Sequence, residues 1–450
     1  MRQEVRFDRI LKYQVTAELT QPLHVGSAGG DNEEVLIHPA TGLPFLQASG
    51  IAGVLRGYMD KSMGRAEDLF GSSGDDAKEC RITVTDGIFT KPDAIRMEKR
   101  PHVKINRETG SVSSVKIKGT ANSAGQKFDM DYVGAGAAFR FELYIKTDLE
   151  RMEPDQTTVL GMLSALNNYE IQFGGKRSEG CGQVRISRIL YRVFVMTDSA
   201  DRAKWAREES LPEAEYKNIT ASLSSVGSRD YVITLSGKTE NDILIRTIAV
   251  NKSGKDAPDA ANIQNSRQEY IIPGSSIKGA IRDRAEKICQ YLQNHGTYCT
   301  DLIARTFGEA AEGTGEGIAG NASFADIVIG DRESNDNMPL QHRIHIDKFT
   351  GGVMNGALIN EKNAAGSIRL EIRVHHGDYQ KKSTAILLMA LRDLANGLYN
   401  LGSGYSIGKG FLKPEKLELK TPEGRAVYYY SKKGSGSETG LFTECIQSLR

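Results

Sequence analysis

Apolar and polar residues alternate along several segments of the chain, and other segments carry apolar residues at helical spacing. Alternation predicts strands at residues 13–19, 230–237, 136–146 and 366–376. Helical spacing predicts helices at 157–170 and 382–400. A glycine-rich loop and a last strand follow each of these helices. Strands before, between and after two helices predict α+β units of the ferredoxin-like kind.

The pattern occurs twice, because four landmarks recur in the same order. They are a serine-started helix (45–59 and 271–288), LFG and TFG (69–71 and 306–308), a basic block (100–110 and 341–351) and a glycine-rich loop (174–182 and 402–410). The repeat predicts two tandem domains, 1–197 and 229–430. Residues 198–228 are charged, include the single tryptophan and suggest a linker packed on a domain surface. The tail 431–450 either docks on a partner or frays.

Charge and cysteine content limit the classes of protein. The 450 residues carry a formal net charge of +1, so a nucleic-acid surface would have to be local. The first ten residues are charged, unlike a signal peptide, and no stretch has the roughly 18 apolar residues of a membrane span. Five cysteines without a CxxC pair indicate free thiols in a reducing cytoplasm.

The repeated helix is a candidate phosphate site. Ser275 or Ser276 can cap it after a Pro-Gly turn, which by itself explains the serines. However, a helix N-terminus also attracts anions, and Lys278 in the first turn opposes the helix dipole. Arg282 lies one turn further on the same side. In the first copy, Ser49 and Arg56 remain and an alanine replaces the lysine.

The glycine-rich loops do not match a nucleotide-hydrolysing P-loop, because their spacing and the residue after the lysine are wrong. They place Lys176, Arg177 and Lys409 on backbone that can approach a sugar-phosphate chain closely. Tight turns between helix and strand are the alternative.

Together, the helix IPGSSIKGAIR, the loops and the block RPHVKINRETG resemble the RAMP superfamily of repeat-associated CRISPR proteins. The similarity is to backbone subunits of type III effector complexes, with two units fused. It implies RNA-recognition-like cores that bind guide RNA, a complementary target RNA and other effector subunits. It also implies a β-hairpin "thumb" that enters the guide–target duplex.

Residues 102–133 and 342–362 fit these thumbs. Their basic side chains could contact backbone phosphates: His102, Lys104, Arg107, His345 and Lys348. The alternative is an exposed hairpin with incidental charge.

The resemblance also implies cleavage of target RNA by a loop aspartate. Asp31 in the first copy and Asp259 or Asp256 in the second are the candidates, with Asp31 and Asp259 as ligands of Mg²⁺ or Mn²⁺. The expected products are a 2′,3′-cyclic phosphate and a 5′-hydroxyl. Two alternatives remain: a structural RNA-binding subunit whose loop acids are only solvated, and a metal-independent guide-processing endonuclease that uses His24.

Overall fold

The computed structural model describes residues 6–26, 34–64, 66–74, 77–103, 114–116, 123–125, 127–207, 211–225, 227–248, 257–294, 301–310, 317–354, 356–430 and 437–449. The chain divides into two compact units. Unit 1 comprises Met1–His102, Phe128–Arg177 and Cys181–Ser228. Unit 2 comprises Val103–Lys127, Ser178–Gly180 and Arg229–Arg450. No helix of the described residues is long and apolar enough to cross a membrane.

Unit 1 is built on a seven-stranded sheet of order β11-β10-β1-β9-β4-β2, with β3 also paired to β9. Its strands are β1 (Arg9–Leu19), β2 (Phe45–Leu46), β3 (Ile82–Val84), β4 (Gly87–Phe89), β9 (Ala138–Thr147), β10 (Val184–Val195) and β11 (Lys217–Asn218). Its helices are α1 (Ala48–Ser62), α2 (Ala66–Phe70), α3 (Met152–Asn167) and α4 (Ser199–Trp205), with short 3-10 turns η1 (Pro92–Ala94), η4 (Glu213–Glu215) and η5 (Thr220–Ser225). The 3-10 turn η2 (Arg177–Glu179) begins at the last residue of a unit 1 segment, and its Ser178 and Glu179 belong to unit 2. Two small ladders, β5 (Met97–Val103) with β8 (Lys127–Val133) and β6 (Ser114–Lys116) with β7 (Ser123–Gly125), lie between β4 and β9 in sequence.

Unit 2 has a five-stranded sheet of order β16-β20-β12-β21-β22. Its strands are β12 (Tyr231–Thr239), β16 (Ala322–Phe324), β20 (Ser367–Val374), β21 (Leu412–Thr421) and β22 (Gly424–Tyr429). A second sheet has the order β13-β14-β19-β18, and β15 pairs with β17. These strands are β13 (Arg246–Ile248), β14 (Ala260–Asn262), β15 (Ile271–Ile272), β17 (Ile327–Val328), β18 (Gln341–Arg343) and β19 (Ile359–Lys362). The helices are α5 (Gly274–Asn294), α6 (Leu302–Phe307), α7 (Arg332–Asp336), α8 (Gln380–Ala395) and α9 (Gly440–Gln447), with the 3-10 turn η6 (Tyr405–Ile407).

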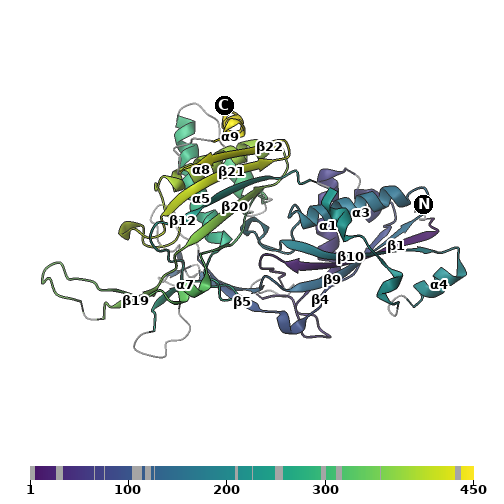
Figure 1. Cartoon of the computed structure of the whole chain (residues 1–450), viewed down its shortest axis with the longest axis horizontal. Coiled ribbons are helices and arrows are strands. Elements are labelled where there is room, and N and C mark those ends of the chain that lie inside the picture. The colour runs from purple at the N-terminus through teal and green to yellow at the C-terminus, as the bar shows by residue number, and fades with distance from the viewer. Residues whose placement is uncertain are drawn as a thin grey trace. The chain divides into compact units, whose positions relative to one another are not determined.

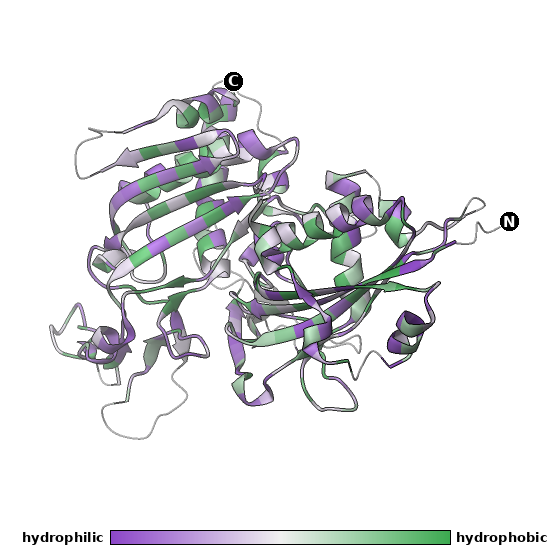
Figure 2. Cartoon of the chain, turned by 45° about the vertical axis from the view of Figure 1, so that its right-hand side comes forward, coloured by the Kyte–Doolittle hydropathy of each residue, from purple (hydrophilic) through white to green (hydrophobic). Residues whose placement is uncertain are grey.

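Alternation in the long strands separates a helix-covered face from an open face of each sheet. Tyr13 and Val15 of β1 are fully buried and pack in one cluster with Leu55 of α1 and Leu163 of α3. The same arrangement joins β12 and β20 to α5 and α8 in unit 2 (Figure 1). Figure 2 shows the alternation as green and purple bands along these strands. The predicted α+β architecture is confirmed, and the main sheet of each unit is antiparallel.

Single hydrogen bonds repeat between the units and fix which residues are equivalent. Leu23 and Val133 bond each other through their backbones, as do Ile243 and Ala364. The Phe173 N–H donates to the Gly182 carbonyl, and the Leu401 N–H donates to that of Gly410. Each first strand also has a β-bulge at the same place, between Thr16 and Ala17 and between Ser236 and Gly237. The two copies expected from sequence therefore have equivalent residues at these positions.

The second helices start and end earlier than predicted. α3 spans Met152–Asn167 rather than 157–170, and α8 spans Gln380–Ala395 rather than 382–400. In unit 2 the reason is local, since Asn396 is the C-cap and Gly397 has φ +70°.

The segments 198–228 and 437–449 pack on their own units. Trp205 contacts Phe194 and Tyr144 edge-on, while Ile219 and Leu223 join the unit 1 core. In the tail, Phe442 of α9 joins the unit 2 core. Residues 437–449 thus pack on the chain's own unit 2, which neither expectation for the tail, a partner or a frayed end, had described.

Candidate nucleic-acid interface

The repeated helices start on an aspartate rather than on a serine cap. The Gly274 N–H of α5 donates to Asp326 Oδ1 at 2.8 Å, and the Ala48 N–H of α1 donates to Asp86 Oδ1 at 2.6 Å. Ser275 and Ser276 lie inside the first turn of α5, half-buried, so the expectation that either caps the helix is wrong. A carboxylate already accepts a hydrogen bond from the first amide of each helix. Its negative charge reduces the positive potential at the helix N-terminus that would attract a phosphate.

Sequence analysis missed these aspartates, although a signal existed. Asp86 and Asp326 each lie between two short strands, in TDG and ADI, and both fall within the shared order of landmarks. The role of Asp326 depends on Gly274 as well, because a Cβ at residue 274 would collide with the carbonyl oxygens of Phe324 and Glu179.

The basic residues of α5 have partners within unit 2. Lys278 Nζ donates to Ser178 Oγ at 2.8 Å. Arg282 donates from Nε to Glu286 Oε1 at 3.0 Å and from a terminal nitrogen to the Gly308 carbonyl at 3.0 Å. Lys278 thus has an internal partner, and its contact with a phosphate stays a prediction, whereas Arg282 ties α5 to the turn after α6.

The equivalent side chains of unit 1 are more accessible. Ser49 and Arg56 are exposed. Arg56 lines a cavity of about 570 Å³ together with Ser72, Ser73 and Lys78. Of the two arginines predicted to contact phosphate, Arg56 is the one that the structure leaves facing an open space.

The glycine-rich loops fold back onto the segment that follows the first strand of each unit. The Gly175 N–H donates to the His24 carbonyl at 2.8 Å, and the Ser403 N–H donates to the Leu244 carbonyl at 3.0 Å. Gly182 has φ +75°, and a Cβ on it would collide with the Phe173 backbone. The backbone of these loops therefore forms tight turns, and contact of their side chains with RNA is a separate question for each basic residue.

Lys409 does not face solvent. It is 5% exposed and its Nζ lies 2.7 Å from Glu361 Oε2 and 3.7 Å from Asp242 Oδ2. Arg246 and Arg343 also contact the fully buried Glu361. Burial by itself would raise the Glu361 pKa, but the hydrogen bonds and positive charge of Lys409 and Arg343 bring that pKa below its ordinary value. The prediction that Lys409 contacts RNA is wrong because its charge is used inside the unit.

Lys176 and Arg177 remain near the surface of the first loop. Lys176 is half-buried, with its Nζ 5.8 Å from the centre of the Phe128 ring, and Arg177 is exposed.

His102 is not a phosphate-binding cation. Its Nε2 bonds the Tyr132 hydroxyl at 2.9 Å, and its ring stacks on Phe128 with centroids 5.2 Å apart. Burial, followed by the positive charges of Lys176 and Arg100, lowers the His102 pKa to about 4. The imidazole is neutral at pH 7, so it cannot neutralise a phosphate there.

The hairpin between β18 and β19 carries the exposed side chains of unit 2 that best fit the predicted thumb. His345 and Lys348 are exposed, as predicted. Exposed apolar side chains accompany them: Ile344, Ile346, Phe349, Val353, Met354 and Leu358. Phe349 is 98% exposed at a turn that Asp347 builds by accepting the N–H groups of Phe349 and Thr350. These hydrogen bonds, first that of Thr350, lower the Asp347 pKa.

Of the catalytic candidates, only Asp259 lies within the described residues. Its N–H donates to the Asn360 carbonyl at 2.8 Å, and its Oδ2 accepts the Asn360 N–H at 2.9 Å. Asp31, Asp256 and the predicted RNA ligands Lys104 and Arg107 lie outside the described residues. Within the part of the chain that the structure describes, no cluster of three or more His, Cys, Asp or Glu side chains could hold a metal ion.

His24 has a structural role. It is 5% exposed, and its Nδ1 bonds the Asp131 carbonyl at 2.9 Å, which makes Nδ1 the donor. Its burial argues against acid–base catalysis on an RNA at this residue.

Comparison with known proteins supports the duplicated architecture. A family model for the RAMP superfamily matches residues 16–185 and 236–413. No curated protein matches the chain. Among solved structures, the chain is similar to one chain of the "Type III-B Cmr-beta bound to cognate target RNA", with 16% identity and a TM-score of 0.31. That similarity covers 41% of this chain and 61% of the other, so less than two thirds of that protein's length is spanned. Because the family model matches well over half of the chain, in two regions that fold alike, the chain belongs to the RAMP superfamily.

Proposed function

We propose that this chain is a guide-RNA-binding backbone subunit of a type III CRISPR effector complex, and that it cleaves a bound target RNA through the loop that ends at Asp259. Guide RNA, complementary target RNA and other effector subunits are its partners. RAMP membership in both regions supports an RNA partner.

The observation that carries the proposal is the hairpin between β18 and β19. Exposed apolar side chains on a hairpin cost solvation unless a partner covers them. Phe349 at the turn offers an aromatic face on which a base can stack, Ile346 offers apolar surface, and His345 and Lys348 offer groups for the flanking phosphates. A nucleic-acid duplex has both kinds of complementary surface, so the hairpin fits a thumb that enters the guide–target duplex.

Asp259 supports cleavage less strongly. It lies at the start of β14, beside β19 at the base of the hairpin, and is exposed. The described residues do not build a metal centre of their own. Asp259 would supply one ligand to Mg²⁺ or Mn²⁺, and an RNA phosphate and water the others. The ion would stabilise charge on the phosphate while the RNA's own 2′-OH attacks.

The test uses the complete complex with guide and an end-labelled complementary RNA. Asp259→Ala is expected to remove one cut, and Asp31→Ala another, with both losses seen on a sequencing gel. If the cuts remain unchanged in the double variant, these aspartates do not cleave.

Phe349→Ala tests the hairpin in the same complex. Since base–aromatic stacking contributes roughly 1–3 kcal/mol per base, we expect target affinity to fall at least about fivefold. Tyr291→Ala, which removes a 64% exposed ring from α5, is the matched control. Equal effects of the two substitutions would contradict the assignment of a thumb.

One observation favours a second candidate, a structural RNA-binding subunit without nuclease activity. The Asp259 carboxylate already accepts a backbone N–H from Asn360, as an aspartate that only closes a strand would. That function predicts an intact target RNA under any divalent metal.

A further inference from the structure

The open face of the unit 1 sheet carries a row of two arginines separated by a hydroxyl. Thr16 of β1 pairs with Arg140 of β9 on one side and with Arg188 of β10 on the other. All three face away from the core, because their neighbours Val15, Phe139 and Ile189 are buried in it. The row therefore lies on the face of the sheet opposite α1 and α3, apart from the start of α1.

Unit 2 repeats the row at the equivalent place. Ser236 of β12 pairs with Arg369 of β20 and with Lys416 of β21, and the same bulge follows it. The same order of a cation, a hydroxyl and a second cation thus occurs in both units. Packing of the core does not require this order, because these side chains face away from the core. In unit 2, acids of the same strands lie near both cations, with Arg369 3.9 Å from Glu371 and Lys416 2.6 Å from Glu418.

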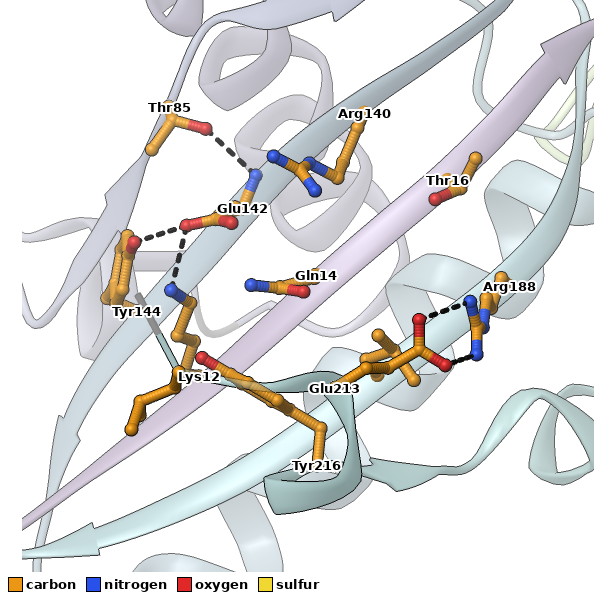
Figure 3. A pocket seen from close by; sticks show the side chains of 12 residues that line it. Lys12, Gln14, Thr16, Thr85, Arg140, Glu142, Tyr144, Arg188, Glu213 and Tyr216 are labelled. Carbon is orange, nitrogen blue, oxygen red and sulfur yellow. Dashed lines mark hydrogen bonds and ion pairs between the residues drawn. The ribbon is translucent and has the colours of Figure 1, made fainter. Parts of the chain in front are cut away.

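In unit 1 the row opens into a cavity of about 630 Å³ (Figure 3). Arg188 is held there by both carboxylate oxygens of Glu213, which shows that this end of the row accepts an oxyanion. Arg140 is exposed. Among the described residues, Arg140 and Gln14 have no hydrogen-bond or ion-pair partner for their side chains.

The floor of the cavity is aromatic and polar. Lys12 is 2% exposed, is paired with Glu142 at 3.1 Å, and has its Nζ 5.2 Å from the centre of the Tyr144 ring and 5.8 Å from that of Tyr216. The Tyr216 hydroxyl is buried and has no partner among the described residues. The charges of Lys12 and Arg188 are thus balanced by Glu142 and Glu213, whereas the positive charge of Arg140 is not balanced by a described residue.

We propose that this cavity binds a nucleotide, with its phosphate group between Arg140 and Thr16. Guanidinium groups bind phosphate through paired, charge-assisted hydrogen bonds. A carboxylate side chain would also suit Arg140, but it would leave most of the cavity empty. A nucleoside fills that space, and the Gln14 amide can both donate to and accept from a base edge. The nucleotide is either free or part of an RNA chain.

The test titrates the full chain by calorimetry with AMP and, separately, with a ten-nucleotide single-stranded RNA. Arg140→Gln is expected to weaken binding about five- to tenfold, since it removes one charge-assisted contact. Lys146→Gln is the control, because it removes one positive charge from the same face of β9. Arg140 is exposed, so its replacement should leave the thermal unfolding midpoint unchanged.

Arg140-dependent binding of AMP assigns the cavity to a free nucleotide. Arg140-dependent binding of the RNA alone assigns it to an RNA chain, and both results support the proposal. If Arg140→Gln weakens neither ligand more than Lys146→Gln does, the proposal is wrong. It is also wrong if a glutamate-rich peptide binds with the same Arg140 dependence while AMP and RNA do not.

Discussion

Equivalent positions beside the glycine-rich loops hold opposite chemistry in the two units. In unit 2, Glu361 and Lys409 form a buried ion pair. Their equivalents in unit 1 are Met130 and Cys181, which pack in a small apolar cluster. The repeated hydrogen bonds make this correspondence certain, because each pair lies at the same distance from bonded residues that match.

The first turn of the second helix shows the reverse. In unit 1, the Asp155 carboxylate of α3 accepts hydrogen bonds from both terminal nitrogens of Arg81, with N···O distances of 2.6 and 2.8 Å. Its equivalent in α8 of unit 2 is Ser383, whose hydroxyl accepts the Thr306 hydroxyl at 2.8 Å. Each unit thus buries an ionic pair at a place where the other has none.

The difference teaches that the shared fold requires a filled and hydrogen-bonded site, and that it does not prescribe charge there. A buried pair and an apolar pair of similar volume can be nearly equal in net stability, whereas half of a buried pair is costly. Single substitutions should therefore cost more unfolding free energy at a site that holds a buried ion pair than at the equivalent neutral site of the other unit.

Glu361→Gln should have the largest effect. It leaves Lys409 buried without its main counterion, so we expect unit 2 to lose about 3–5 kcal/mol of unfolding free energy. Hydrogen exchange of the α8 amides measures it. At the equivalent place in unit 1, Met130→Leu should cost less than about 1.5 kcal/mol. Similar losses of unfolding free energy for Glu361→Gln and Met130→Leu would contradict the view that only unit 2 depends on charge at this site.

Asp155→Asn tests the reverse case. We expect unit 1 to lose about 3 kcal/mol, because Arg81 keeps its charge in a buried site. Trp205, the single tryptophan, packs on Phe194 in unit 1 and reports its unfolding by fluorescence. Ser383→Ala in unit 2 removes one neutral hydrogen bond and should cost about 1 kcal/mol. A larger cost for the serine would show that charge does not decide the difference.

Asp86→Ala and Asp326→Ala examine a feature that the units share. Each removes the carboxylate on the first amide of a repeated helix, so each should cost about 1 kcal/mol in its own unit. Trp205 fluorescence measures the loss in unit 1, and hydrogen exchange of the α8 amides measures the loss in unit 2. Unequal losses would mean that the helix starts are less alike than their hydrogen bonds indicate.

Acidification should weaken unit 1 by the smallest amount. The His102 pKa is about 4 in the folded chain, below the ordinary 6.5, so only the unfolded chain binds the proton between these values. Stability is therefore full above pH 6.5 and falls as the pH approaches 4, by about 1 kcal/mol for this partly exposed ring. Trp205 fluorescence in urea at several pH values should show it. The His102→Gln variant should show a flatter dependence.

Four of the positively charged or basic residues singled out from the sequence have internal partners, for a common reason. Lys409, Lys278, Arg282 and His102 were predicted to face RNA, but each bonds a group elsewhere in its own unit. Sequence shows a cation, but it does not show whether a buried acid or carbonyl will be folded beside it.

Two kinds of information thus specify this protein. The sequence alone determined its duplication, its α+β architecture and its main strands and helices, because hydrophobic periodicity is a local property of neighbouring residues. Only the tertiary structure decided which charges are internal, which aspartates start the helices and that two cations flank a hydroxyl on the open face of each sheet. Those features depend on residues far apart in sequence, and it is the pairing of strands that brings them together.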